Sequence, residues 1–307
     1  MVENKWNINY SNTHIIPCKF DYYEPKSLNE AIEILSKYGS DAKILAGGTD
    51  LLILIKMGVL KPRCIVNIKK ISDLYGIHEQ GDQLIIGALT KLRTLEKSKV
   101  IKENFTALYE AVKSMASVQI RNMATIGGNL CNASPAADTA PPLMVLEAKL
   151  RVISIEGEKT IDVREFFLGP RKTILKRNEL LKEIMVPVYK DYGYSYMKLG
   201  RRNSFTLSIV SVASLVKVED NVFSDVRIAL NSIAPTPIRA FSVEKYLVGR
   251  KVTIDSIKVA SKLVVKDISP ITDIRATAEY RRDMAIVLTY DVFKVALKRL
   301  GIEFLEG

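Results

Sequence analysis

The chain has 307 residues, of which 48% are hydrophobic and 26% charged. This is the composition of a globular protein, and the length allows a substantial core and favours two domains. The 45 Lys and Arg residues exceed the 34 Asp and Glu residues, which gives a net charge of +11. Because the basic residues are spread over the chain and alternate with Glu, as in 91–105, they predict a solvated surface or a face for an acidic partner rather than a nucleic-acid site.

The cysteines and histidines exclude several kinds of site. Cys18, Cys64 and Cys131 are far apart, and no pair has the spacing of a zinc or iron–sulfur site. With only His14 and His78, a histidine-built metal site or catalytic triad is not expected. The apolar runs are too short to span a bilayer, and the first twenty residues lack the pattern of a secretory signal. A cytoplasmic location is therefore expected.

The front half of the chain alternates helix and strand signals. Ser27 and Glu30 form a capping box before an apolar stripe that closes at Gly39, which predicts a helix. Thr90 is expected to cap a short helix that runs to Glu96. The other elements expected in this half are strands over 43–46, 63–68 and 83–88, helices over 101–115 and 138–146, and a hairpin of 149–155 with 159–163.

The back part begins after a change of composition at residues 188–193. A strand is expected over 194–199, immediately after this boundary. Two β-rich runs, 208–218 and 222–231, are joined by Glu219-Asp220-Asn221, which is typical of a hairpin. Amphipathic helices are expected over 240–248, 253–266 and 277–300.

Two glycine pairs lie in otherwise apolar surroundings. Gly47-Gly48-Thr49-Asp50 follows the strand expected at 43–46, and Thr125–Asn129 lies in the small-residue stretch 117–142. Glycine allows backbone amides to approach an anion closely. Neither segment is a Walker A loop or a G-x-G-x-x-G fingerprint. Each pair alone is also compatible with a tight turn, whereas the two loops together could hold the two phosphates of a dinucleotide.

The sequences AGGTDLL at 46–52 and TIGGNLCNASPAADTAPP at 125–142 resemble the FAD-binding medium subunit of molybdenum hydroxylases, the group of xanthine dehydrogenase, aerobic carbon monoxide dehydrogenase and aldehyde oxidoreductase. The resemblance covers nearly the whole chain. It implies an α+β fold with a two-subdomain FAD-binding domain of the PCMH/VAO type at 1–190, divided into about 1–70 and 71–190. A small α/β C-terminal domain at 191–307, with a three-stranded antiparallel sheet and helices, is expected to follow.

The resemblance also implies which residues contact the cofactor, with backbone amides of both glycine loops on the pyrophosphate. The first loop consists of Ile44, Leu45, Ala46, Gly47, Gly48, Thr49, Asp50 and Leu51, and the second of Thr125, Ile126, Gly127, Gly128 and Asn129. Four further residues fall on positions near the cofactor in the family: Met115, Asp138, Leu181 and Lys198. Read without the resemblance, Asp138 could be a helix N-cap, Met115 and Leu181 core residues, and Lys198 a solvated charge.

The segment 201–208 departs from the acidic residues that relatives often carry beside the flavin. This difference concerns the electron acceptor, not flavin binding. Arg201 and Arg202 are compatible with surface charge, a subunit contact or a cofactor contact.

By resemblance, the chain is the FAD-binding electron-transfer subunit of a molybdenum-containing hydroxylase or dehydrogenase. It would relay electrons from the [2Fe-2S] clusters of a small subunit to an external acceptor, while a large subunit would hold the molybdenum cofactor, in a dimer of heterotrimers. No catalytic or metal-binding residue is expected in this chain. The alternative is a self-sufficient flavin-dependent oxidase or reductase of the related two-loop fold, which would need a catalytic acid near the flavin. Carbon monoxide, aldehydes, purines and nicotinate-like rings are the substrate classes of such complexes.

Overall fold

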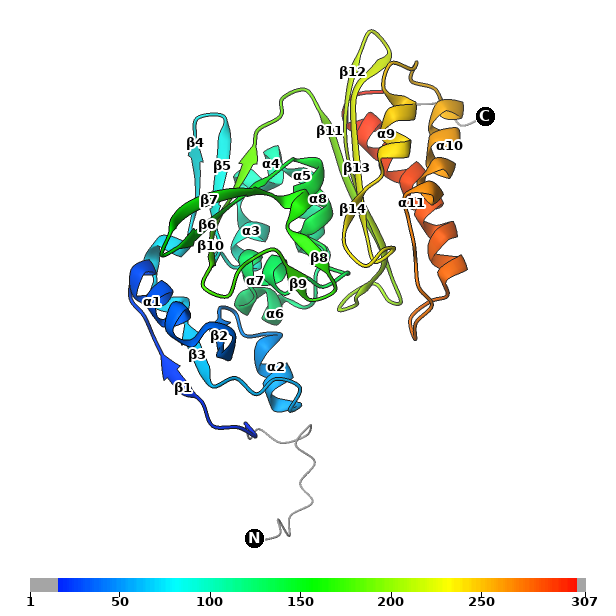
Figure 1. Cartoon of the computed structure of the whole chain (residues 1–307). Helices are drawn as coiled ribbons and strands as arrows, with labels where there is room; N and C mark the ends of the chain where they lie inside the picture. Colours follow the sequence, from blue (N-terminus) through cyan, green and yellow to red (C-terminus); the bar gives the residue numbers. More distant parts are fainter. Residues whose placement is uncertain (1–15, 303–307) are drawn as a thin grey trace.

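The structure, a computed structural model, describes residues 16–302. Residues 1–15 and 303–307 of the two expected domains, and with them His14, lie outside the described residues. The described chain forms three sheets and a two-stranded hairpin. The sheets follow one another in chain order from the blue N-terminal end to the yellow and red C-terminal end (Figure 1).

The first sheet is parallel and has the strand order β1-β3-β2. Its strands are β1 (Asp21–Tyr23), β2 (Ala42–Leu45) and β3 (Cys64–Asn67), with α1 (Leu28–Tyr38) between β1 and β2 and α2 (Leu51–Lys56) after β2. The Ser27 hydroxyl accepts a hydrogen bond from the Glu30 amide at 3.2 Å, and Gly39 ends α1 with φ 53°. The Ser27 cap and the Gly39 stop are confirmed, whereas the Glu30 carboxylate accepts from the Lys26 amide at 2.8 Å and so does not complete the expected capping box. Helix α2 had no predicted counterpart.

The second sheet is antiparallel, with the order β4-β5-β10-β6-β7. Its strands are β4 (Ile77–Gln80), β5 (Gln83–Gly87), β6 (Lys149–Ser154), β7 (Gly157–Asp162) and β10 (Leu180–Pro187). The helices around it are α3 (Leu92–Lys97), α4 (Lys99–Asn104), α5 (Thr106–Ser114), α6 (Val118–Met123), α7 (Ile126–Cys131) and α8 (Ala140–Val145), and the hairpin is β8 (Phe167–Gly169) with β9 (Lys172–Thr173). One buried apolar cluster joins this sheet to the helices.

Two predictions for this region are wrong for tertiary reasons. The single helix expected over 101–115 is two helices, α4 and α5, which meet at Phe105. Phe105 is fully buried and has φ −134° and ψ 51°, so its anchoring in the core interrupts the helix. Thr90 does not cap α3, because its hydroxyl is bonded instead to the amide of Gly76 at 3.1 Å and to the carbonyl of Gly76 at 2.9 Å.

The third sheet is antiparallel and consists of β11 (Gly193–Gly200), β12 (Ser208–Glu219), β13 (Val222–Asn231) and β14 (Ile238–Arg239). The first three are the predicted strands, and the two-residue β14 adds a short fourth. The helices α9 (Phe241–Leu247), α10 (Ile254–Leu263) and α11 (Ala278–Arg299) lie on its outer side, while α5 and α8 contact its inner side (Figure 1). This sheet therefore separates a second apolar core from the first.

Short 3-10 turns connect several elements: Gly39–Asp41, Ile68–Lys70, Ser72–Leu74, Val163–Glu165 and Val264–Lys266. None of the helices in residues 16–302 combines the length and the apolar character that crossing a bilayer requires.

Gly193 is the first residue of β11 and lies where this strand packs against α11. Its substitution tests this packing. A Cβ on Gly193 would lie 2.2 Å from the carbonyl oxygen of Ala296. Replacing Gly193 with Ala is therefore expected to push β11 away from α11 and to lower the free energy of unfolding by about 1–3 kcal/mol, as overpacking does. Urea denaturation measures the loss. Gly169→Ala is the matched control, since a Cβ there meets no heavy atom within 4 Å, and an equal loss in both variants would contradict the contact.

Candidate cofactor-binding site

A cleft of about 1320 Å³ lies where the three sheets meet. It exceeds the roughly 300–1,000 Å³ of most small-molecule pockets, so its size suits a long ligand. Its walls come from the loop after β2, from the segment 115–138, from β10, and from the loops 201–207 and 274–275. Segments that are distant in the sequence therefore build one site.

The loop after β2 presents a row of free backbone amides to the cleft. Within residues 16–302, the amides of Gly47, Gly48, Thr49 and Asp50 donate to no acceptor. Gly48 has φ 78°, a left-handed conformation that favours glycine. Consecutive unpaired amides in a turn form an anion-binding concavity. This loop thus has the chemistry of a phosphate cradle.

The second glycine pair differs from the expectation that its amides are also free. Thr125 caps α7 by accepting a hydrogen bond from the Gly128 amide at 3.1 Å. The Gly127 amide donates to the Ala88 carbonyl at 2.9 Å, and the Asn129 amide donates to the Thr125 carbonyl at 3.0 Å. The start of α7 therefore uses these amides internally.

The side chain of Asn129 remains available at this end of the cleft. Its Oδ1 accepts a hydrogen bond from the Thr139 hydroxyl at 2.6 Å. Its Nδ2 makes no hydrogen bond to any other described residue, and Asn129 lines the cleft. The Asn129 Nδ2 is therefore free to donate to a bound ligand, although the backbone amides at the start of α7 are occupied.

Most of the residues predicted for the site are brought together here. Fourteen of them line the cleft: Ile44, Ala46, Gly47, Gly48, Thr49, Asp50, Leu51, Met115, Thr125, Gly127, Gly128, Asn129, Asp138 and Leu181. Leu45 and Ile126 instead pack in the core behind the two loops, with exposed fractions of 7% and 0%. Lys198 lies outside the lining and contacts Asp138.

Asp138 is the centre of a buried polar network between the second and third sheets. Its Oδ2 accepts a hydrogen bond from the Lys198 ammonium at 2.7 Å. Its Oδ1 accepts one from the Tyr196 hydroxyl at 2.9 Å and others from Ser208 and Asn231. The residue before α8 that serves as its N-cap is Thr139, so the alternative of Asp138 as a helix cap is wrong.

Burial and the neighbouring Asp138 charge raise the pKa of Tyr196 well above its ordinary value. The Tyr196 hydroxyl therefore stays protonated and acts as a donor to the carboxylate. Lys198 is not a solvated charge, because only 6% of its side chain is exposed and its ammonium also donates to the Ser114 carbonyl at 3.3 Å. A buried carboxylate with this many donors is fixed in position.

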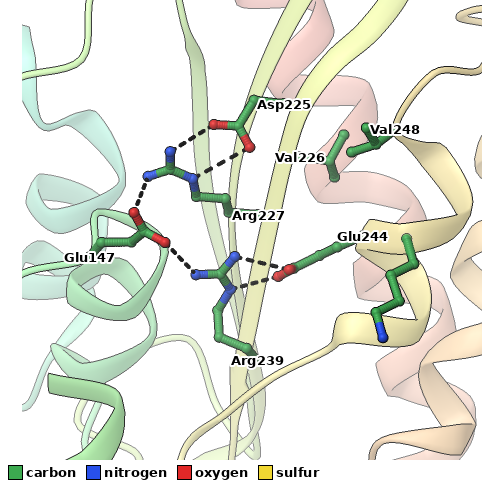
Figure 2. Close-up of a pocket in the computed structure, with 8 residues that line it drawn as sticks. Glu147, Asp225, Val226, Arg227, Arg239, Glu244 and Val248 are labelled. Atoms are coloured by element: carbon green, nitrogen blue, oxygen red, sulfur yellow. Dashed lines mark hydrogen bonds and ion pairs between the residues drawn. The ribbon is translucent and has the colours of Figure 1, made fainter. Parts of the chain in front are cut away.

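The far end of α8 is clamped by two arginines of the third sheet. Figure 2 shows Glu147 between the guanidinium groups of Arg227 and Arg239, at 3.2 and 3.6 Å. Arg227 also pairs with Asp225 at 2.7 Å and Arg239 with Glu244 at 2.5 Å. The same arginines donate to carbonyls in the last turn of α8, where a cation is favourable. These ion pairs line a separate hollow of about 530 Å³ and hold the helix against the sheet.

Several arginines in the cleft wall were missed or left undecided by sequence reasoning. Arg201 and Arg202 both line the cleft, together with Arg171 and Arg275. The sequence shows Arg201-Arg202 as a pair of charges, but it does not show that the pair lies in the wall of the cleft. Arg171 and Arg275 gave no signal, since only the fold brings them to the same cleft.

Comparisons with known proteins agree with this geometry. Residues 18–189 match the family described as the FAD binding domain in molybdopterin dehydrogenase, and residues 194–296 match the CO dehydrogenase flavoprotein C-terminal domain. Fold and site thus define a FAD-binding subunit of an oxidoreductase. The chain belongs to the molybdopterin dehydrogenase flavoprotein family, the medium subunits of molybdenum hydroxylases.

Two relatives and one solved structure show how far the similarity extends. The chain is 34% identical over 272 residues to the carbon monoxide dehydrogenase medium chain of Hydrogenophaga pseudoflava, covering 88% of this chain and 94% of the relative. It is 33% identical over 279 residues to the glyceraldehyde dehydrogenase medium chain of Sulfolobus acidocaldarius, covering 91% and 98%. The structure of the H. pseudoflava enzyme lacking the Mo-pyranopterin moiety of its molybdenum cofactor superimposes with a TM-score of 0.90 at 34% identity, over 93% of this chain and 99% of that one. The expected fold is confirmed.

Removing the cation from the Asp138 network tests its role. Lys198→Met leaves a buried carboxylate without its partner, which is expected to lower the free energy of unfolding by about 3–5 kcal/mol. Asp138→Asn combined with Lys198→Met removes both charges and is expected to recover part of that loss. Urea denaturation of the apoprotein compares the two, and a double variant no more stable than the single one would refute the pairing.

Asp273 precedes the cleft residues 274–275, and its ion pairs are expected to make the stability of the fold depend on pH in acid. Burial alone would raise its pKa, but hydrogen bonds from the Arg275 amide, from Arg281 and from the Arg275 side chain, each at 2.8 Å, outweigh burial and lower the pKa to about 2. The ordinary value of 3.8 applies to the unfolded chain. Because the folded-state pKa is the lower one, the stabilisation is complete above about pH 4 and is lost as the pH falls towards 2.

Unfolding measured between pH 5 and pH 2 checks this dependence. Asp273→Asn is expected to flatten the loss of stability at the acid end. Asp255→Asn, at the start of α10, is the control with the same chemical change at a position away from the cleft. Identical acid profiles for the two variants would contradict the assignment.

Proposed function

We propose that FAD lies in this cleft with its diphosphate on the loop after β2. The observation that carries the proposal is the row of four free amides from Gly47 to Asp50 in the cleft wall. A hydrogen bond to a charged group contributes roughly 1.5–3 kcal/mol, so several such amides can hold the cofactor without a covalent link. Asn129 supplies a further donor from the opposite segment.

The other predicted site residues have different roles, according to whether they line the cleft or lie behind it. Met115 and Leu181 line the cleft and provide apolar contact, and Gly128 allows α7 to approach the ligand closely. Leu45 and Ile126 support the two loops from the core. Lys198 acts through Asp138, whose carboxylate it positions.

We further infer that the chain is the electron-transfer subunit of a complex. Bound flavin exchanges electrons singly or in pairs, which suits a relay from the [2Fe-2S] clusters of a small subunit to an external acceptor. The residues of this chain bind and orient the cofactor, and they exclude water from its inner end. The relatives are medium chains of dehydrogenases named for different substrates. We therefore assign substrate choice and the molybdenum cofactor to a large partner subunit, in a cytoplasmic dimer of heterotrimers.

A division into two domains supports this arrangement. We propose a FAD-binding domain at 1–190, built from subdomains 1–70 and 71–190, and a C-terminal domain at 191–307. Among the described residues, the first two sheets fall within 21–187 and the third within 193–239. The cleft forms where these units meet.

The absorption spectrum of the purified chain and its co-purifying partners test the proposed function. Bands of oxidised flavin, together with a large molybdenum subunit and a small cluster-bearing subunit, are expected. Substrate turnover by the isolated chain would point instead to a self-sufficient oxidase or reductase. A colourless protein that takes up no added FAD would refute both.

Gly128→Val is expected to abolish most FAD binding. A Cβ at this position would lie 2.8 Å from the Thr125 hydroxyl and 3.8 Å from the Ala46 side chain, so a branched residue would wedge the two loops apart. The flavin-to-protein ratio after desalting measures the effect. Gly169→Val, at a position with open space around its Cβ, is the control. Full occupancy in Gly128→Val would count against the two-loop site.

A further inference from the structure

The outer edge of the cleft is formed by two loops of the third sheet and its helices. We call this edge the rim, and its residues are Arg201, Arg202, Phe205, Leu207, Ile274 and Arg275. The Arg201 guanidinium donates to the Ile274 carbonyl at 3.4 Å, which joins the loops. The rim is thus one surface, although its two halves are about seventy residues apart in the chain.

The cleft carries an excess of positive charge, and three of its cationic side chains, those of Arg201, Arg202 and Arg275, lie on the rim. Five cationic side chains line the cleft in all, namely those of Lys43, Arg171, Arg201, Arg202 and Arg275. The carboxylates in the lining are Asp50 and Asp138, and the second is already paired with Lys198. Asp273 pairs with Arg275, and the diphosphate of a bound FAD neutralises a further part of this charge. Arg201 and Arg202 make no ion pair with a described residue, so they keep a positive potential at the rim that attracts anions.

The guanidinium groups of the rim are held in place before any partner arrives. Arg202 donates to the Phe205 carbonyl at 3.0 Å, and its guanidinium lies 5.5 Å from the Phe205 ring centre. Arg275 is fixed by Asp273 at 2.8 Å. Each guanidinium has five donors and keeps several of them free. Such preorganisation lowers the entropy lost on binding.

Apolar side chains on the rim point to a partner larger than the cleft. Phe205, Leu207 and Ile274 are 54%, 50% and 89% exposed. A ligand enclosed by the cleft would leave these outer surfaces in water, whereas a protein surface would cover them. Arginine and aromatic residues, here Arg202 beside Phe205, are enriched in protein–protein interfaces.

We propose that the rim docks an acidic one-electron carrier protein that accepts electrons from the flavin in the cleft. This inference rests on the proposed function, because it presupposes bound FAD. Two carrier molecules each accept one electron at their own redox centre. Both electrons come from the two-electron-reduced flavin, which returns to its oxidised form as its N–H protons pass to water, and no bond forms between the proteins.

The test compares two carriers that differ only in charge. The full chain with FAD is reduced anaerobically and mixed in a stopped-flow instrument with cytochrome c, a basic haem protein, or with the same cytochrome after succinylation of its lysines. Flavin reoxidation is expected to be about 10-fold faster with the acidic form at low salt, and the gap is expected to close as salt screens the charges. Equal rates, or a preference for the basic form, would overturn the proposal.

Substitution of the rim locates the effect. Arg201→Gln with Arg275→Gln is expected to slow reoxidation by the acidic cytochrome about 10-fold at low salt, with little change for the basic form. Lys258→Gln with Lys262→Gln makes the same charge change on α10, at the outer edge of the molecule (Figure 1), and is expected to have no effect. Equal effects of the two pairs would refute docking at the rim. If the rim variant loses its flavin, the salt dependence of the unaltered protein still decides.

Two further arms separate the other outcomes. The rim variant is also mixed with ferricyanide, a small anion. If its flavin is reoxidised more slowly than that of the unaltered protein by ferricyanide but not by the acidic cytochrome, the rim is a small-anion site and the protein-docking proposal is overturned. The charge preference is also expected to persist in the assembled complex, and its loss on assembly would mean that a partner subunit covers the rim. A chain without bound FAD would refute the proposed function itself, whereas FAD that is reoxidised without charge preference refutes only this inference.

Discussion

The backbone of Gly47 rests directly on the backbone of Met123 and Ala124, and the cleft depends on this contact. A Cβ on Gly47 would lie 2.4 Å from the Met123 carbonyl oxygen and 2.8 Å from the Ala124 Cα, so no other residue fits without separating the segments. A Cβ on Gly127 would likewise lie 2.7 Å from the Cβ and from the carbonyl oxygen of Ala88. The glycines therefore act first by close packing. That packing sets the amides from Gly47 to Asp50 against the segment that carries Asn129.

Helix α8 connects this site to the third sheet, because it is held at both ends. Asp138, just before its first turn, is bonded by Tyr196 and Lys198, and Glu147, just after its last turn, is bonded by Arg227 and Arg239. Buried ion pairs carry a large desolvation penalty, so they contribute more to a unique geometry than to net stability. Since Asp138 lines the cleft, the shape of its inner end depends on how the third sheet docks. One short helix thereby couples the shape of the proposed cofactor site to the docking of the back part.

Charge is distributed in the structure in a way that the chain order conceals. The excess of basic residues is spread along the sequence, yet the fold places Arg171, Arg201, Arg202 and Arg275 around one opening. The same opening has few carboxylates. A flavin site needs an inner end that fixes the cofactor and an outer edge that admits an oxidant. Here the inner end is a neutralised, buried network, and the outer edge is positive and exposed.

Local patterns in the sequence were sufficient for most elements, and most of the residues predicted for the site line one cleft. The Ser27 cap and the hairpins are determined by neighbours a few residues apart, and these predictions held. The break at Phe105, the loss of the Thr90 cap and the bond from the Gly127 amide to Ala88 depend on contacts between distant segments. Burial of Lys198 against Asp138 is of the same kind, because it requires the third sheet to dock on the second. The Gly128 and Asn129 amides are instead occupied by their near neighbour Thr125. The sequence by itself indicated which groups could bind a diphosphate. Only the tertiary structure decided which of them remain free, because the acceptor that takes an amide, as Ala88 takes that of Gly127, can be distant in the sequence.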